Sequence, residues 1–115
     1  MMTIPKILHI GGIDYKIEFP YEFRERTDLL GQHIAAQTVI RLTDRDGGGR
    51  KTSIGSLRDT FFHETIHAIL WQYYGEKEID EQLVCALSHG LIQVLKDNDL
   101  TTVFEGEEKD YETNS

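Results

Sequence analysis

The segment His63-Glu64-Thr65-Ile66-His67 places two imidazoles four residues apart, with a carboxyl group directly after the first. Residues four apart on a helix lie on one face, so both imidazoles can converge on one point, as two nitrogen ligands of a zinc ion must. Glu64 lies about 100° further round such a helix, where its carboxyl group can reach a zinc-bound water without binding the metal. The motif therefore predicts a metal site with a general base beside it.

A catalytic zinc ion needs a third protein ligand and an open position. The residues that follow the motif supply four candidates: Glu78, Asp80, Glu81 and His89. We choose Glu81 because it begins a second helix whose small side chains Cys85 and Ser88, on the same stripe, allow two helices to approach closely. Asp80 is the alternative, although helix capping accounts for it. His89 lies about 12 Å from Glu81 along the helix axis, so the two are not expected to bind one ion.

Hydrophobic patterning predicts the elements that position these residues. Residues 6–19 alternate around Gly11-Gly12, which predicts two antiparallel strands joined by a tight turn. Residues 33–43 predict a third strand that follows a turn at Gly31. From about Ser56 to Tyr74 the apolar period becomes helical, and this helix carries the motif. Its N-terminus is capped by Ser56 with Asp59, or alternatively by Ser53, and Gly75 is expected to end it in a left-handed conformation.

The remaining residues of the two helices are interpreted from the helical wheel. Both motif histidines lie beside the apolar arc of the first helix, and Tyr74, two turns beyond His67, lies close to them. Tyr74 is our candidate donor to the transition state, with His89 as the alternative, whereas Tyr73 is expected in the core and Trp71 beside the site. The second helix is predicted from about Asp80 to Asp97, with an apolar face formed by Leu83, Val84, Ala86, Leu87, Gly90, Leu91, Val94 and Leu95. His9 and His33 on the strands are interpreted as structural or surface residues, and Cys85 as a small buried thiol.

These elements predict an α+β fold, in which a small three-stranded, antiparallel-type sheet is followed by two packed helices. With 115 residues, the chain is expected to form a single domain over residues 1–98. Residues 99–115 are polar and acidic, which predicts a flexible C-terminal tail.

Composition excludes several classes of function. The formal net charge is −8 and no basic stripe is present, which argues against a nucleic-acid binder. The single cysteine excludes an intrachain disulfide and a cysteine-rich zinc site. No apolar run has the length of a signal peptide core or a membrane span. We therefore expect a soluble protein without membrane partners, in the cytoplasm of a bacterial or phage-infected host cell.

The strands, the helix carrying HETIHAILWQYYG and the helix beginning DEQLVCALSHGL resemble compact zincin metallopeptidases of the gluzincin type. ImmA/IrrE-type peptidases and minimal phage or prophage proteins share this layout, and the resemblance covers roughly residues 6–97. It implies a Zn²⁺-dependent metalloendopeptidase in which His63, His67 and Glu81 bind zinc and Glu64 activates the zinc-bound water. It also implies that a strand before the motif helix forms the sheet edge. Residues 34–42 would match that strand, and a peptide or protein substrate would pair with it.

A second class of function is compatible with the same residues. A chain of 115 residues can wall only one side of a substrate cleft. The alternative is therefore a latent or non-catalytic zinc-binding protein of zincin fold, acting through protein–protein interaction as a phage or prophage accessory protein. Three protein ligands with an open position would indicate a catalytic site, whereas four protein ligands would indicate a structural one.

Overall fold

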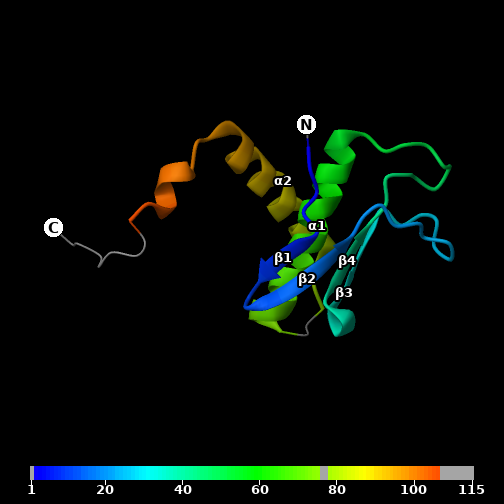
Figure 1. The fold of residues 1–115 in the computed structure, drawn as a ribbon, viewed down its shortest axis with the longest axis horizontal. Coiled ribbons are helices and arrows are strands. Elements are labelled where there is room, and N and C mark those ends of the chain that lie inside the picture. The colour runs from blue at the N-terminus through cyan, green and yellow to red at the C-terminus, as the bar shows by residue number, and fades with distance from the viewer. Residues whose placement is uncertain (1, 76–77, 107–115) are drawn as a thin grey trace.

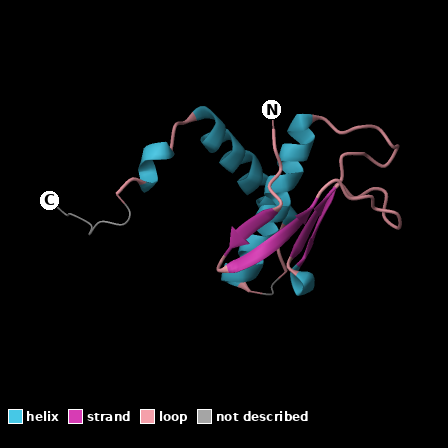
Figure 2. Cartoon of the chain, in the orientation of Figure 1, coloured by secondary structure: helices cyan, strands magenta, loops and turns pink. Residues whose placement is uncertain are grey.

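The computed structural model describes residues 2–75 and 78–106 as an α+β arrangement of a sheet and two long helices (Figures 1 and 2). The strands are β1 (Ile7–Ile10), β2 (Ile13–Glu18), β3 (Gly31–Ile34) and β4 (Val39–Leu42). The helices are α1 (Ile54–Tyr74) and α2 (Glu81–Asp97), with short 3-10 turns at Ala35–Gln37 and Thr101–Phe104. Among the described residues, neither long helix is apolar enough over a sufficient length to cross a membrane.

The sheet has four strands in the order β1-β2-β4-β3, and it is mixed. β2 pairs with β4 in parallel, whereas the β1–β2 and β3–β4 pairs are antiparallel. The predicted three-stranded antiparallel sheet is therefore wrong in strand number and direction. The segment predicted as one strand over 33–43 reverses at Ala35–Gln37, where Thr38 takes a φ of 50°. No Gly or Pro marks this reversal, and Gly31, predicted in a turn, begins β3.

The Gly11-Gly12 turn between β1 and β2 is confirmed. Both glycines have positive φ, 58° and 81°, as a tight hairpin of the favoured twist requires. A Cβ at Gly11 would lie 2.1 Å from Cγ of Gln72, so α1 passes directly over the turn. The Gln72 side chain donates a hydrogen bond to the Gly11 carbonyl at 3.3 Å, which ties the C-terminal part of α1 to the hairpin.

α1 is buried on two sides, and this explains its broad apolar pattern. One side packs on the sheet through Ala68, with Phe61 partly buried against the same core, which contains Tyr15 and five aliphatic or small residues: Ile10, Ile17, Ile40, Leu42 and Ala68. Ile66 is buried about 160° round the helix from Ala68, on the side where α2 packs through Val84. Tyr73 is 75% exposed, so its predicted core position is wrong.

The helix ends follow their local sequences. Ser53 Oγ accepts a hydrogen bond from the Ser56 N–H at 3.0 Å, so the alternative cap is the one used and α1 begins at Ile54. Gly75 has a positive φ of 94°, but its ψ of −178° is extended and not left-handed helical. Asp80 caps α2 by accepting from the Gln82 N–H at 2.9 Å, as predicted.

The flexible C-terminal tail stays a prediction. Thr101–Phe104 forms a 3-10 turn within the stretch predicted to be a flexible tail. Residues 107–115 lie outside the described residues.

Candidate metal centre

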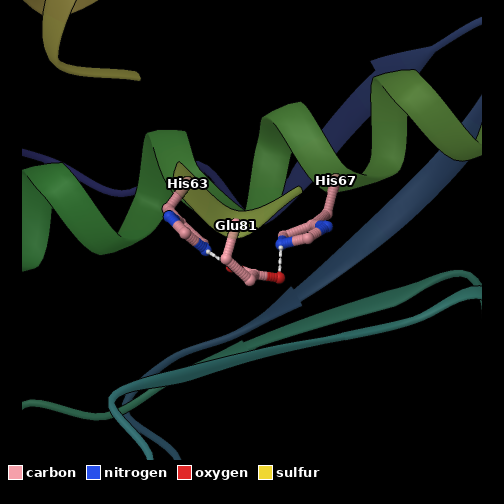
Figure 3. A group of neighbouring side chains, drawn as sticks. All are labelled: His63, His67 and Glu81. Carbon is pink, nitrogen blue, oxygen red and sulfur yellow. Dashed lines mark hydrogen bonds and ion pairs between the residues drawn. The ribbon is translucent and has the colours of Figure 1, made fainter. Parts of the chain in front are cut away.

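Three side chains converge where the first residue of α2 meets the middle of α1. His63 Nε2 lies 3.0 Å from one Glu81 carboxylate oxygen, and His67 Nε2 lies 3.0 Å from the other. All three ligand atoms lie within 4.8 Å of one another. Figure 3 shows the two rings pointing from adjacent turns of α1 toward the carboxylate. The predicted ligand set is thus brought together as a single group that could hold a metal ion.

The donor set and its spacing fit a divalent ion. Zinc binds imidazole nitrogen and carboxylate oxygen at about 2.0–2.2 Å, which puts tetrahedral ligand atoms about 3.4 Å apart. Each histidine lies 3.0 Å from a different oxygen of Glu81, and one ligand atom from each residue lies within 4.8 Å of the others, so small side-chain rotations would bring the three atoms to this spacing. Two imidazoles and one carboxylate suit zinc and also other first-row divalent ions.

The centre is open on the side of α2. The His63 and His67 side chains are 23% and 19% exposed, whereas Glu81 is 64% exposed. The group is therefore most accessible to solvent on the side of Glu81. Three protein ligands with an open position are the arrangement of a catalytic rather than a structural zinc site.

Glu64 lies on the sheet side of the centre and is not part of the ligand group. Burial, and secondarily the charge of Glu81, raise the pKa of its carboxyl group to about 7. At this value the group can both accept and return a proton near neutral pH.

Gly31 makes room for Glu64. A Cβ at Gly31 would lie 2.5 Å from Thr60 Cγ2 and 3.0 Å from Glu64 Cγ, so only glycine lets β3 approach α1 this closely. From sequence Gly31 was predicted in a turn, whereas the contacts that require glycine there join it to Thr60 and Glu64, 29 and 33 positions further along the chain.

Two cavities of about 260 Å³ and 240 Å³ flank the ligand group. The tryptophan cavity is lined by His33, His67, Trp71, Gly75, Ile79 and Glu81. The aspartate cavity is lined by Leu30, Asp59, Thr60, His63, Glu64, Cys85, Ser88 and His89. The tryptophan cavity contains His67 and His33, and the aspartate cavity contains His63 and Leu30. The two cavities therefore lie along β3, one on each side of the ligand group.

His33 is a residue that sequence reasoning missed. Its Nε2 lies 3.0 Å from the Tyr15 hydroxyl, and its ring lies edge-on to Trp71 with centroids 6.4 Å apart. Burial, and to a smaller extent His67, lower the pKa of the His33 imidazole. Interpreted from sequence as structural or surface, His33 instead lines the tryptophan cavity. No local pattern indicates this, because the strand reversal that sets its position was itself not predicted.

The other predicted site residues have separate places. His89 lines the aspartate cavity, where its Nε2 lies 3.9 Å from an Asp59 oxygen. Cys85 is exposed, contrary to prediction, with Sγ 3.8 Å from His63 Nδ1. Trp71 lies beside the site as expected. Tyr74 is 57% exposed, and its role as a donor stays a prediction.

The sheet edge beside the centre is β3, not the whole predicted segment 34–42. β4 lies between β2 and β3, so its main chain is paired on both sides. Thr43 N–H donates to the Leu30 carbonyl at 3.1 Å, which makes this a hydrogen-bonded pair at the end of the ladder. Such pairs alternate in antiparallel strands, so the main-chain groups of Gly31 and His33 point away from β4 toward the open edge.

No protein-family model, curated protein or solved structure matches this chain. The chemical interpretation therefore rests on the geometry of its own residues. That geometry consists of a His₂Glu group that could hold an ion, a neighbouring half-buried carboxyl group and a strand edge.

Proposed function

We propose that this protein is a zinc-dependent metallopeptidase of zincin type that hydrolyses a peptide bond. The observation that carries the proposal is the convergence of His63, His67 and Glu81 within 4.8 Å, with Glu64 half-buried next to them. A stabilising metal site needs the ligands but has no use for a half-buried carboxyl group beside them, whose pKa burial raises. Hydrolysis requires both a ligand group that holds the ion and a carboxyl group beside it.

Each residue has a role that follows from its position. The two histidines and Glu81 hold the ion, and a bound zinc ion supplies Lewis-acid activation of water and of the peptide carbonyl. Glu64 accepts the proton from the attacking water and returns it to the leaving amine, because its carboxyl group lies beside the ligand group without belonging to it. Gly31 is a positioning residue, because it sets the distance between β3 and the Glu64 side chain.

The substrate class follows from β3. Its outward-facing main-chain groups at Gly31 and His33 can pair with an extended peptide by strand addition. The tryptophan and aspartate cavities then receive side chains on either side of the bond that is cleaved. We therefore propose that a peptide or an extended protein segment binds along β3, not along β4.

One observation favours a second candidate, a zinc-binding interaction protein without activity. Each cavity holds only about 250 Å³, below the usual range for a small-molecule site, and Glu81 is 64% exposed. A substrate would be held mainly through the edge strand, which a stably bound partner could also use. The two candidates differ in turnover, not in metal binding.

The experiment measures metal content and peptide cleavage in the same preparations. We expect about one zinc per chain in the wild type and loss of the ion in His63→Ala and Glu81→Ala. Glu64→Gln should keep the ion and lose cleavage of a peptide library by about 10²-fold or more. Glu78→Gln is the matched control, because Glu78 is exposed and does not belong to the ligand group. This variant should keep both the zinc ion and peptide cleavage.

Three outcomes decide the proposal. A wild type that binds no zinc at neutral pH contradicts the metal centre. Normal cleavage by Glu64→Gln contradicts the mechanism. A zinc-loaded wild type that cleaves nothing in a library of extended peptides supports the interaction protein instead.

A further inference from the structure

α2 presents an apolar face that α1 does not cover. The leucine face consists of Leu83, Ala86, Leu87, Gly90, Leu91 and Val94. Its four large members are between 39% and 52% exposed, and the two small ones are also exposed. α2 instead packs on α1 through Val84 and Ser88, which are buried. The C-terminal half of α2 projects away from the body of the molecule (Figure 1).

The leucine face is a continuous stripe and not a scatter of exposed residues. On a helical wheel it spans about 140°, and its middle lies about 110° from the side that carries Val84 and Ser88. An exposed apolar stripe of this length is typical of a surface that binds another protein.

Gly90 has no side chain and so lowers the surface of the leucine face at its position. Glycine weakens a helix interior, and a Cβ at Gly90 would meet no atom within 4 Å, so nothing in the described chain requires it. Ala86, one turn earlier, is the other small residue of the face. On the helical wheel both lie on the same side of the ridge formed by Leu83, Leu87 and Leu91, and together they leave a hollow beside that ridge that a large apolar side chain of another molecule can enter.

The leucine face is complementary to itself. When two copies of α2 run antiparallel about a two-fold axis between Ser88 and His89, Leu87 of each copy lies opposite Gly90 of the other. In the same register Leu83 lies opposite Val94, while on the two flanks Leu91 meets Leu91 and Ala86 meets Ala86 of the other copy. Each copy therefore places the large Leu87 side chain at Gly90 of the other, as an isologous interface requires. We propose that the protein forms an antiparallel homodimer through the leucine face of α2.

The leucine face fits a small interface, and the net charge of the chain disfavours a lipid surface as its occupant. From Leu83 to Val94 the face is about 17 Å long, so pairing two copies gives an interface at the lower end of the specific ones. A net charge of −8 opposes binding to an anionic lipid surface. The same charge makes the two copies repel each other, so added salt should tighten the dimer.

Sedimentation equilibrium of the full chain across the micromolar range tests this inference, with and without zinc. We expect a wild-type mass of twice 13.2 kDa, reached at lower concentration as salt increases. Leu87→Glu should weaken the dimer by about 100-fold or more, because it buries a carboxylate opposite Gly90. Gly90→Gln should also give monomers, while raising their Tm by a few degrees because glutamine favours the helix.

Ile54→Glu, which changes a 61% exposed apolar residue at the start of α1, is the matched control and should stay dimeric. A wild type that is monomeric at the highest concentration overturns the inference. A monomeric wild type that co-floats with phosphatidylcholine–phosphatidylglycerol vesicles in a density gradient also overturns it. That result would mean that the leucine face binds a membrane. A Leu87→Glu or Gly90→Gln dimer as tight as the wild type would place the interface elsewhere. None of these outcomes depends on peptidase activity.

Discussion

At the scale of single residues, the centre combines ligand side chains that must be accessible to an ion with a carboxyl group, Glu64, whose pKa depends on burial. His63 and His67 stay partly exposed and Glu81 mostly exposed, so an ion can reach them. Glu64, one position after His63, is enclosed by β3, and burial holds the pKa of its carboxyl group near 7. The 100° step between neighbouring helix residues is what separates the two environments.

Burial of Glu64 makes the stability of the metal-free protein depend on pH. A carboxyl group whose pKa rises from 4.5 in the unfolded chain to about 7 in the fold favours the fold while it is protonated, below pH 4.5. That contribution, up to about 3 kcal/mol, is lost as the pH rises through 7. Glu64→Gln stays neutral, so in EDTA it should be more stable than the wild type at pH 8 and equally stable at pH 4.

Urea unfolding at the two pH values, followed by circular dichroism, measures this difference. Glu78→Gln removes an exposed carboxyl group and serves as the control, with no comparable gain at pH 8. Equal gains from both variants would mean that general charge repulsion, not burial of Glu64, is responsible.

At the scale of elements, the contact between β3 and α1 determines the site. β3 exists because the chain reverses at Ala35–Gln37, and this places Gly31 against Thr60 and Glu64. The strand edge at β3 and the Glu64 side chain on α1 therefore come from segments that sequence patterning treated separately.

Gly31→Ala should disturb this contact. Its Cβ would lie 2.5 Å from Thr60 Cγ2, so β3 and α1 must separate, at a cost of about 1–3 kcal/mol in unfolding free energy. Thr60→Ser removes that methyl group and keeps the hydroxyl that donates to the Ser56 carbonyl at 2.9 Å. The double variant should regain part of the lost stability in a denaturant titration.

Gly55→Ala is the control for this experiment, because a Cβ there would approach no atom closer than 3.9 Å. It should be neutral or slightly stabilising, since alanine favours the helix. A Gly31→Ala variant as stable as Gly55→Ala would contradict the close approach of β3 to α1.

At the scale of the whole molecule, the metal centre joins two helices that otherwise share few buried side chains. Val84 and Ser88 are the buried residues of α2, and Glu81 contacts both motif histidines of α1. An ion held by these three side chains would therefore bind the folded chain and not the unfolded one, and it would couple α2 to the rest of the fold.

Zinc should stabilise the whole molecule by this linkage. At about 1,000 times its dissociation constant, an ion that binds only the folded state adds about 4 kcal/mol, which raises Tm by about 10 °C or more in a chain of this size. Differential scanning calorimetry with zinc and with EDTA measures the shift. Glu81→Gln should lose most of it, and Glu78→Gln should keep it.

An equal zinc shift in the wild type and in Glu81→Gln would mean that α2 does not contribute a ligand. An equal shift in His63→Ala would contradict the centre altogether.

The sequence by itself determined the features that depend on neighbouring residues. Helical periodicity put His63 and His67 on one face, Asp80 marked the start of α2, and Gly11-Gly12 marked a hairpin. Glu81 was also reached from sequence, because a helix that follows a short turn must return along its predecessor. Each of these is set by backbone geometry over a few residues.

Only the tertiary structure decided the features that join distant segments. It made β3 the sheet edge, placed His33 beside Trp71, and required glycine at position 31. It also turned the leucine face of α2 away from α1, although hydrophobicity alone would have put that face inside. Which apolar surface is buried depends on the volume available against the other elements, and no local pattern in the chain encodes that volume.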